Sequence, residues 1–377
     1  NKIWSSHHFF IHFSLPHSYL LSLEIQIIIN HVILNFSKSI IANTGSASAL
    51  NNIFIGIIVL LFVQLLLFLF KHFSGQDILD VSQYLGGKIL KVITGFLFIT
   101  YFIVFTSILL RSFSENLKII YLDKLPIIVI VIFFIFAITF GNKLGFKVIS
   151  KVNLLILPVI LFCIIFVLLA NFKNYDFNGL FPILGSGIKS TFITGLSNMF
   201  AFSSLSILYF LPPMVEDANS FKKIARISTI LSIVLFFFSI LSFLALFPFI
   251  RNSEEIMALY LATRYIEFGR FFQRLDAIFL LIWTVAVISY LCIAVALSIN
   301  VFKKISNIVD ANGVLYCFAG IIFLISLIPT NLAQLNFIEI NIFKYVVFIL
   351  LFAYSPLVLI FANIKKRLRG GKNEKIP

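Results

Sequence analysis

Charged side chains are scarce in this chain, and their scarcity excludes a soluble protein. Asp, Glu, Lys and Arg together make up 12% of the 377 residues, whereas soluble domains carry about a quarter. Apolar residues account for 60%, and the mean hydropathy is +1.07. This number of charged residues is too small to cover a water-facing surface of a chain this long. The apolar faces of the protein must therefore contact lipid. The composition predicts an all-α integral membrane protein.

The residue patterns of enzymes and metal sites are also missing. Three cysteines lie in apolar runs without paired spacing, which excludes a disulfide framework. Four of the six histidines fall within the first twenty residues, but no carboxylate or cysteine accompanies them as a further ligand. There is no phosphate-binding loop, nucleophile elbow or zinc-binding helix motif. We therefore expect no enzyme activity, no cofactor and no metal.

The net charge of +14 is distributed in small groups between apolar runs, which argues against a nucleic-acid partner. The groups recur in alternate loops, and the opposite loops are mixed in sign. By the positive-inside rule, the basic loops and both termini are expected in the cytoplasm. The basic groups are Lys71, Lys88, Lys91, Lys143, Lys147, Lys151, Lys222, Lys223, Arg226, Lys303, Lys304 and the tail from 365.

Stretches without charged residues predict about ten transmembrane helices, because a crossing needs about 20 residues. Residues 1–22 are expected to be a poorly ordered N-terminal segment, 23–364 the ten-helix domain and 365–377 a basic cytoplasmic tail. The expected spans are 23–42, 53–70, 92–110, 125–142, 152–172, 190–215, 227–250, 277–302, 311–338 and 345–364.

Several short motifs, in order along the chain, resemble those of one known family. They are FSGQDILDVSQYLGGKILKVI from residue 73, LLRSFSE from 109, FGNKLGFKVISKVNLLILP from 140, NYDFNGLFPILGSGIK from 174 and QRLDAIFLLIWTVAVISY from 273. From about Glu24 to Lys372 the chain resembles the spore germination receptor B subunits, the endospore germination permease family. The first span departs from the family pattern, with Ala47 and Ala49 where Asp and Trp are expected.

The resemblance implies the fold of the amino acid–polyamine–organocation transporters. That fold has two inverted five-helix repeats, with helices one and six broken near the midplane. It also implies a nutrient-sensing subunit in the spore inner membrane that binds a small germinant, which we expect to be an L-amino acid. The expected partners are the lipid bilayer and the A and C subunits of a germinant receptor.

The ligand site is expected between spans one, three, six and eight. Asn35 and Ser37 are candidates from the first span, and Ser197 and Asn198 from the sixth, where Gly195 also favours a break. Spans three and eight contribute Tyr101, Phe105, Thr284 and Tyr290.

Three charged residues at helix ends are expected to have structural or gating roles. Arg111 and Glu115 are spaced for an ion pair on one helix, and Asp276 opens span eight.

Two other functions are compatible with the sequence. One is a secondary amino-acid permease coupled to sodium or protons, although proton coupling is disfavoured because Lys38 is the only charged residue well inside an expected span. The other is a scaffold subunit that binds no ligand, which the altered first span suggests.

Overall fold

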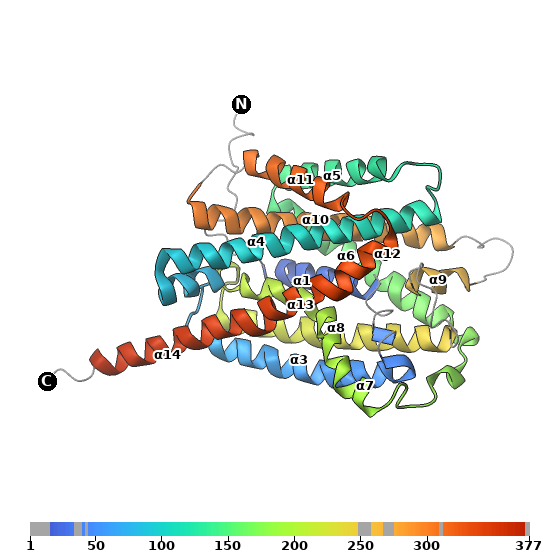
Figure 1. Ribbon diagram of the computed structural model, residues 1–377, viewed down its shortest axis with the longest axis horizontal. Coiled ribbons are helices and arrows are strands. Elements are labelled where there is room, and N and C mark those ends of the chain that lie inside the picture. The colour runs from blue at the N-terminus through green and yellow to red at the C-terminus, as the bar shows by residue number, and fades with distance from the viewer. Residues whose placement is uncertain are drawn as a thin grey trace.

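The computed structural model describes residues 16–33, 40–41, 44–247, 258–266, 275–308 and 312–373. These residues form helices with no strand among them, and most of the long helices run lengthwise along the molecule (Figure 1). The main elements are α1 (His17–Ile33), α3 (Ser48–Phe70), α4 (Ile78–Ile120), α5 (Ile127–Leu144), α6 (Phe146–Ala170), α7 (Ile188–Phe192), η4 (Thr194–Tyr209), α8 (Ala218–Leu246), α9 (Ala258–Arg264), α10 (Leu275–Ser306) and α11 (Asn312–Ser326). A last continuous helix comprises α12 (Leu332–Ile338), η6 (Glu339–Phe343), α13 (Lys344–Phe348), η7 (Ile349–Tyr354) and α14 (Ser355–Asn373).

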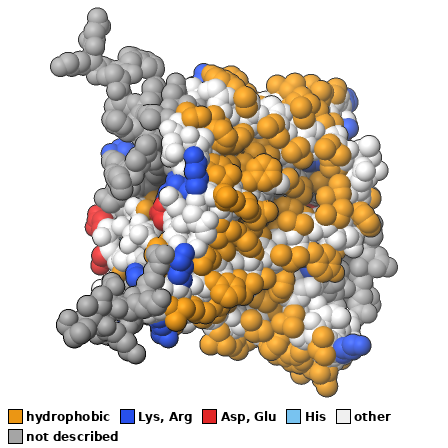
Figure 2. Space-filling model, turned by 60° about the vertical axis from the view of Figure 1, so that its left-hand side comes forward, with side chains coloured by type: hydrophobic (Ala, Val, Ile, Leu, Met, Phe, Trp, Pro, Cys, Tyr) orange, Lys and Arg blue, Asp and Glu red, His pale blue; other side chains and the backbone are white. Residues whose placement is uncertain are grey.

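Eight helical segments of the described chain are long and apolar enough to cross a membrane. Helices α1 and α11, with 17 and 15 residues, correspond to the first and ninth expected spans. Large apolar side chains point outward from the bundle, including Phe136, Leu155 and Phe162. Figure 2 shows one face of the molecule, which carries a broad hydrophobic surface with Lys and Arg toward its margins. The predicted multi-pass membrane protein is confirmed, with a surface suited to lipid.

Helices five spans apart in sequence pack against each other. Helix α1 contacts η4, α3 contacts α8, α4 contacts α10, and α5 contacts α11. Two five-helix repeats related by a pseudo-two-fold axis bring such corresponding helices together, and in transporters of this kind the ligand lies at the interface between the repeats. The packing therefore agrees with the expected repeat architecture.

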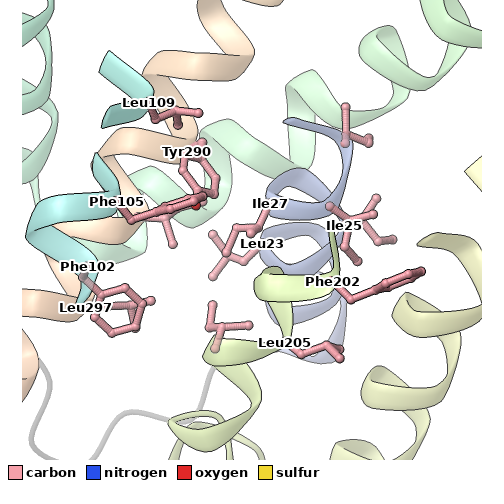
Figure 3. Packing of buried hydrophobic residues seen from close by; sticks show 14 of the residues in the cluster. Leu23, Ile25, Ile27, Phe102, Phe105, Leu109, Phe202, Leu205, Tyr290 and Leu297 are labelled. Atoms are coloured by element: carbon pink, nitrogen blue, oxygen red, sulfur yellow. The ribbon is translucent and has the colours of Figure 1, made fainter. Parts of the chain in front are cut away.

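Helix α1 lies in the interior, in contact with α6, α8, α10 and η4. In Figure 3, Leu23 and Ile27 of α1 extend toward Phe105 and Tyr290, while Ile25 points to the opposite side. Apolar side chains thus surround α1 on more than one face. The helix begins at His17, within the segment 1–22, whose first fifteen residues lie outside the described part of the chain.

The boundary between the last two spans differs from the expected one. Charge-free runs predicted spans over 311–338 and 345–364, but α11 ends at Ser326 and the next helix runs from Leu332 to Asn373. The turn contains Pro329, and Asn331 caps the new helix by accepting a hydrogen bond from Gln334 N at 2.8 Å. The expectation was wrong because it assigned Glu339 and Lys344 to a loop, whereas both lie inside a helix.

Candidate functional site

Five aromatic rings meet where α4, η4, α10 and the last helix come together. Phe105 of α4 lies 5.9 Å from Tyr101, 5.9 Å from Tyr290 and 5.4 Å from Phe343, measured between ring centroids. Phe343 also stacks on Tyr101 at 6.0 Å and meets Phe200 edge-on at 6.0 Å. All five side chains are buried. We call Tyr101, Phe105, Phe200, Tyr290 and Phe343 the aromatic cluster.

The hydroxyl of Tyr101 joins the cluster to the irregular sixth span. It donates to Ser203 O at 3.2 Å and lies 3.4 Å from Ser206 Oγ. The buried Ser203 Oγ has no partner among the described residues. The cluster therefore has a polar side facing η4, which is a common arrangement in sites that bind small molecules.

The sixth span is not a regular α-helix. Helix α7 ends at Phe192, and residues 194–209 form 3₁₀ turns, with a non-helical backbone at Phe202. Runs of 3₁₀ helix longer than three or four residues are uncommon because their hydrogen bonds are poorly aligned. The irregular backbone expected for this span is present, and it starts before Gly195.

An amide network holds the start of η4 against α3. Asn198 Nδ2 donates to Asn51 Oδ1 at 2.9 Å, and Asn51 Nδ2 donates to Thr191 O at 2.6 Å. A side chain on Gly195 would collide with the amide of Asn51. Gly195 is therefore needed for this close approach, and Asn198 positions the span rather than pointing into the aromatic cluster.

Lys344 brings a basic amine into the membrane-spanning part of the bundle. Its Nζ donates to Ser197 Oγ at 2.7 Å, and Ser197 Oγ donates to Thr194 O at 2.8 Å. Only 7% of Lys344 is exposed, and the described residues place no carboxylate within 4.0 Å of its Nζ. The adjacent residue is Phe343 of the cluster, which ends a π-helical stretch, a helix form frequent at functional sites.

Thr284, another predicted ligand residue, is placed differently. Thr284 lies on α10 a turn and a half before Tyr290, and its hydroxyl donates to Leu280 O of its own helix at 2.8 Å. It is not brought to the aromatic cluster. Asn35 and Ser37 lie outside the described residues.

The predicted structural residues each tie helices together away from the cluster. Arg111 Nε and Nη2 donate to Glu115 Oε1 at 2.9 and 2.6 Å, and Nη1 donates to Ser326 O at the end of α11. Asp276 Oδ2 accepts from Tyr121 Oη at 2.7 Å and Tyr260 Oη at 3.3 Å, which joins α10 to the end of α4 and to α9. These contacts suit a structural role at the non-basic end of the bundle.

At the opposite, basic end, Lys304 of α10 holds the start of α4. Its Nζ lies 2.7 Å from Asp77 Oδ2 and 2.6 Å from Asp80 Oδ2. Asp77 caps α4 by accepting from Leu79 N and Asp80 N, and Gly87 with φ +70° kinks the helix after this first segment. Burial raises the pKa of Asp77 to about 6, and Lys304 opposes that rise. The DILD motif is thus the acidic half of an ion-pair latch between α4 and α10.

Replacing Lys304 with methionine should lower the free energy of unfolding by about 1–3 kcal/mol at pH 8. This loss is smaller than the loss on breaking a fully buried ion pair, because Lys304 is partly exposed. A raised pKa means that the neutral form of Asp77 favours the folded state, a contribution that is complete below about 3.8 and lost as the pH rises through about 6. Lys304 is needed to stabilise Asp77 only when Asp77 is ionised. The loss of stability caused by Lys304→Met should therefore grow between pH 5 and pH 8, as measured by thermal unfolding of the purified protein. Adding Asp77→Asn should recover much of it, and a pH-independent loss would contradict the latch.

Four buried ionisable or aromatic groups were not predicted, and one of them is Phe200 of the cluster, on η4. Phe343 and Lys344 fall where the charge pattern predicted a loop. Glu24 of α1 is wholly buried, although it was expected at the edge of the first span. A helical projection of residues 332–350 would have shown that Phe343 and Lys344 can belong to one continuous helix.

Solved transporter structures share this fold over most of the chain. One is "Mhp1, a nucleobase-cation-symport-1 family transporter", in a closed conformation with bromovinylhydantoin bound. It matches with a TM-score of 0.62 and 10% identity, covering 93% of this chain and 78% of that one. A manganese transporter from Eremococcus coleocola matches with a TM-score of 0.53 and 12% identity, covering 93% and 79%. The chain therefore has the fold of a class of membrane transporters.

The sequence comparisons identify the family within that class. The family model described as "Spore germination protein" matches residues 14–335, so the chain belongs to the spore germination protein family. Spore germination protein B2 of Bacillus subtilis (strain 168) is 23% identical over 245 residues, covering 64% of this chain and 67% of the relative. Spore germination protein GerQB of Bacillus cereus is 21% identical over 343 residues, covering 89% and 92%. The protein is thus a germination-related membrane protein with a permease-like fold, and family and fold point away from an enzyme.

Proposed function

We propose that this protein is the nutrient-sensing subunit of a spore germinant receptor, and that it binds a small germinant, an L-amino acid, at the aromatic cluster. The observation that carries the proposal is the meeting of four elements at one set of buried rings, with the Tyr101 hydroxyl on the irregular span. Both five-helix halves contribute to the cluster, so a ligand there contacts both. A ligand that fits one arrangement of the halves better than another shifts the equilibrium between them by that difference in affinity.

Lys344 provides a hydrogen-bond donor for the carboxylate of an amino-acid ligand, which the aromatic rings do not provide. Its Nζ donates to Ser197 Oγ, and a ligand carboxylate beside it would favour the ammonium form, which has three donors. A ligand carboxylate beside Nζ would form a charge-assisted hydrogen bond in a setting that excludes water. The neighbouring rings would cover an apolar side chain, so the arrangement favours an amino acid with an apolar side chain over an acidic one.

In this proposal the chain lies in the spore inner membrane, with its termini and basic loops in the cytoplasm. The asymmetry of Lys and Arg supports this orientation. Ligand-induced movement would pass to the A and C subunits of the receptor. Such movement would change the distance between Lys304 and the two aspartates of the latch, because the latch joins the start of α4 to the end of α10.

A clean deletion of the gene tests the function. Spores lacking the protein are exposed to single L-amino acids while loss of optical density is recorded, and uptake of radiolabelled amino acids is measured in growing cells. We expect loss of the response to one germinant with normal uptake. Normal germination with lost uptake would instead identify a permease, coupled to sodium or protons.

A scaffold subunit that binds no ligand is the remaining alternative. It predicts that the deletion disrupts receptor assembly while substitutions in the aromatic cluster leave every germinant response unchanged. If cluster variants that assemble normally give wild-type dose–response curves, the protein is a scaffold subunit and the sensing proposal is wrong.

A further inference from the structure

Glu24 is a carboxylic acid buried in the interior of the bundle. None of its surface is exposed, and neither Oε1 nor Oε2 has a hydrogen-bond partner among the described residues. It lies midway along α1, the helix that contacts α6, α8, α10 and η4. An ionised carboxylate in such a place loses its hydration without replacement, which is costly enough that the group takes up a proton instead.

The charged groups on the surrounding helices are placed near the helix ends. The charged residues are Lys147 and Lys151 in the first two turns of α6, Lys222, Lys223 and Arg226 in the first three turns of α8, and Asp276 at the start and Lys303 and Lys304 at the end of α10. The other titratable groups on these helices are Cys163 on α6, Tyr290 and Cys292 on α10 and Tyr209 on η4. None of the described cations lies within 4.0 Å of a Glu24 oxygen. The described surroundings therefore supply no countercharge, and the neutral acid is the form that fits.

A second titratable group lies on the same face of α1. His17 precedes Glu24 by seven residues, which is two helical turns or about 10 Å. It begins the helix at the basic end of the bundle, near Asp217 at the N-terminus of α8. His17 Nε2 has no partner among the described residues. A proton leaving Glu24 toward this end would meet an imidazole as the next acceptor.

We propose that Glu24 is a proton-binding site, protonated in the conformation described here and deprotonated when α1 moves enough to admit water. The carboxylic acid O–H bond then breaks, the proton passes to the admitted water, through which it can reach His17, and the carboxylate keeps the electron pair. Binding a proton stabilises the packed arrangement of α1, so its release is coupled to movement of the helix. The proposal does not depend on the identity of the germinant or on ligand binding at the aromatic cluster.

Dicyclohexylcarbodiimide tests the proton directly, because it reacts with protonated carboxyl groups in apolar surroundings. The full-length protein in membranes is labelled at pH 5.5, 7.0 and 8.5, and the peptide containing Glu24 is quantified by mass spectrometry. An ordinary glutamic acid has a pKa of about 4.3, so it is almost fully ionised at pH 7. We expect labelling of Glu24 at pH 7 to be at least half of that at pH 5.5, and none at this position in Glu24→Gln.

Two further arms separate a proton site from its alternatives. Labelling that is lost when sodium is added at constant pH would show that sodium displaces the proton, and it would overturn the proton as the ion coupled to movement of α1. Absence of labelling at every pH would overturn the proton site itself. Glu24→Gln mimics the neutral form and should reach wild-type levels, but the pH dependence of the protein's germination or uptake response should flatten. Glu24→Asp retains a titratable group and should keep a pH dependence. An unchanged pH profile in Glu24→Gln would show a merely structural acid and also overturn the proposal.

Discussion

Spores carrying Phe343→Ala should need at least roughly tenfold more germinant for half-maximal germination, or should respond to a different amino acid. Phe343 contacts Tyr101, Phe105 and Phe200, so it closes the side of the aromatic cluster formed by the last helix. Removing the ring leaves a cavity in the proposed pocket. A ring contact with a ligand contributes about 0.5–1.5 kcal/mol beyond the apolar area that it buries, and the two together reach the roughly 1.4 kcal/mol that corresponds to a tenfold change.

The structure offers a matched control on the same helix. Phe337 lies six residues earlier and is 60% exposed, so Phe337→Ala removes the same atoms from the lipid-facing side. Truncation of a buried phenylalanine costs about 3–5 kcal/mol of stability, so protein levels in spore membranes must be compared, with Phe343→Leu as a milder variant. Equal dose–response curves for Phe343→Ala and Phe337→Ala at equal protein levels would show that the aromatic cluster is not part of the ligand site.

Lys344→Met should weaken the response to an amino-acid germinant about 30-fold or more. A hydrogen bond between charged groups contributes about 1.5–3 kcal/mol, and roughly 2 kcal/mol corresponds to that factor. The methionine keeps the length and apolar stem of the lysine, so packing around the last helix should survive. The measurement is the germinant concentration that gives half-maximal loss of optical density.

Variants at the same contact show whether the charge is what matters. Ser197→Ala removes the hydroxyl that Lys344 contacts but keeps the ammonium, so it should have a much smaller effect than Lys344→Met. Lys344→Arg keeps the charge and should retain part of the response. If Ser197→Ala and Lys344→Met have equal effects, the lysine acts by holding η4 to the last helix, and the ligand carboxylate is bound elsewhere.

Much of the bundle was predictable from the distribution of charge along the chain. The six middle spans were located correctly, but several of their helices extend past the charge-free runs into charged residues. Lys147 and Lys151, for example, lie in α6 rather than before it. Lysine stems can lie along apolar surface while the ammonium reaches water, so a charged residue does not end a membrane helix.

The same reasoning failed for the groups that are charged and buried. Glu24 and Lys344 are covered by helices distant in sequence, and no local pattern shows such cover in advance. Their presence also removes the sequence-based argument against proton coupling, which relied on a lack of ionisable residues in the spans. Tyr101, Phe105 and Tyr290 were predicted to lie near one another because helices three and eight flank the centre of this fold. Phe343 completes the cluster through a π-helical turn that has no sequence signature.

The central claim is that the aromatic cluster binds an L-amino acid, and thermal unfolding of the purified full-length protein tests it most directly. A ligand that binds only the folded state stabilises it by about 2.7 kcal/mol at a hundred times its dissociation constant. Screening single L-amino acids should reveal at least one that raises the unfolding temperature of the wild-type protein and of Phe337→Ala, but not that of Phe343→Ala or Lys344→Met. A stabilising amino acid that acts equally on all four proteins, or none that stabilises the wild type, would contradict the account.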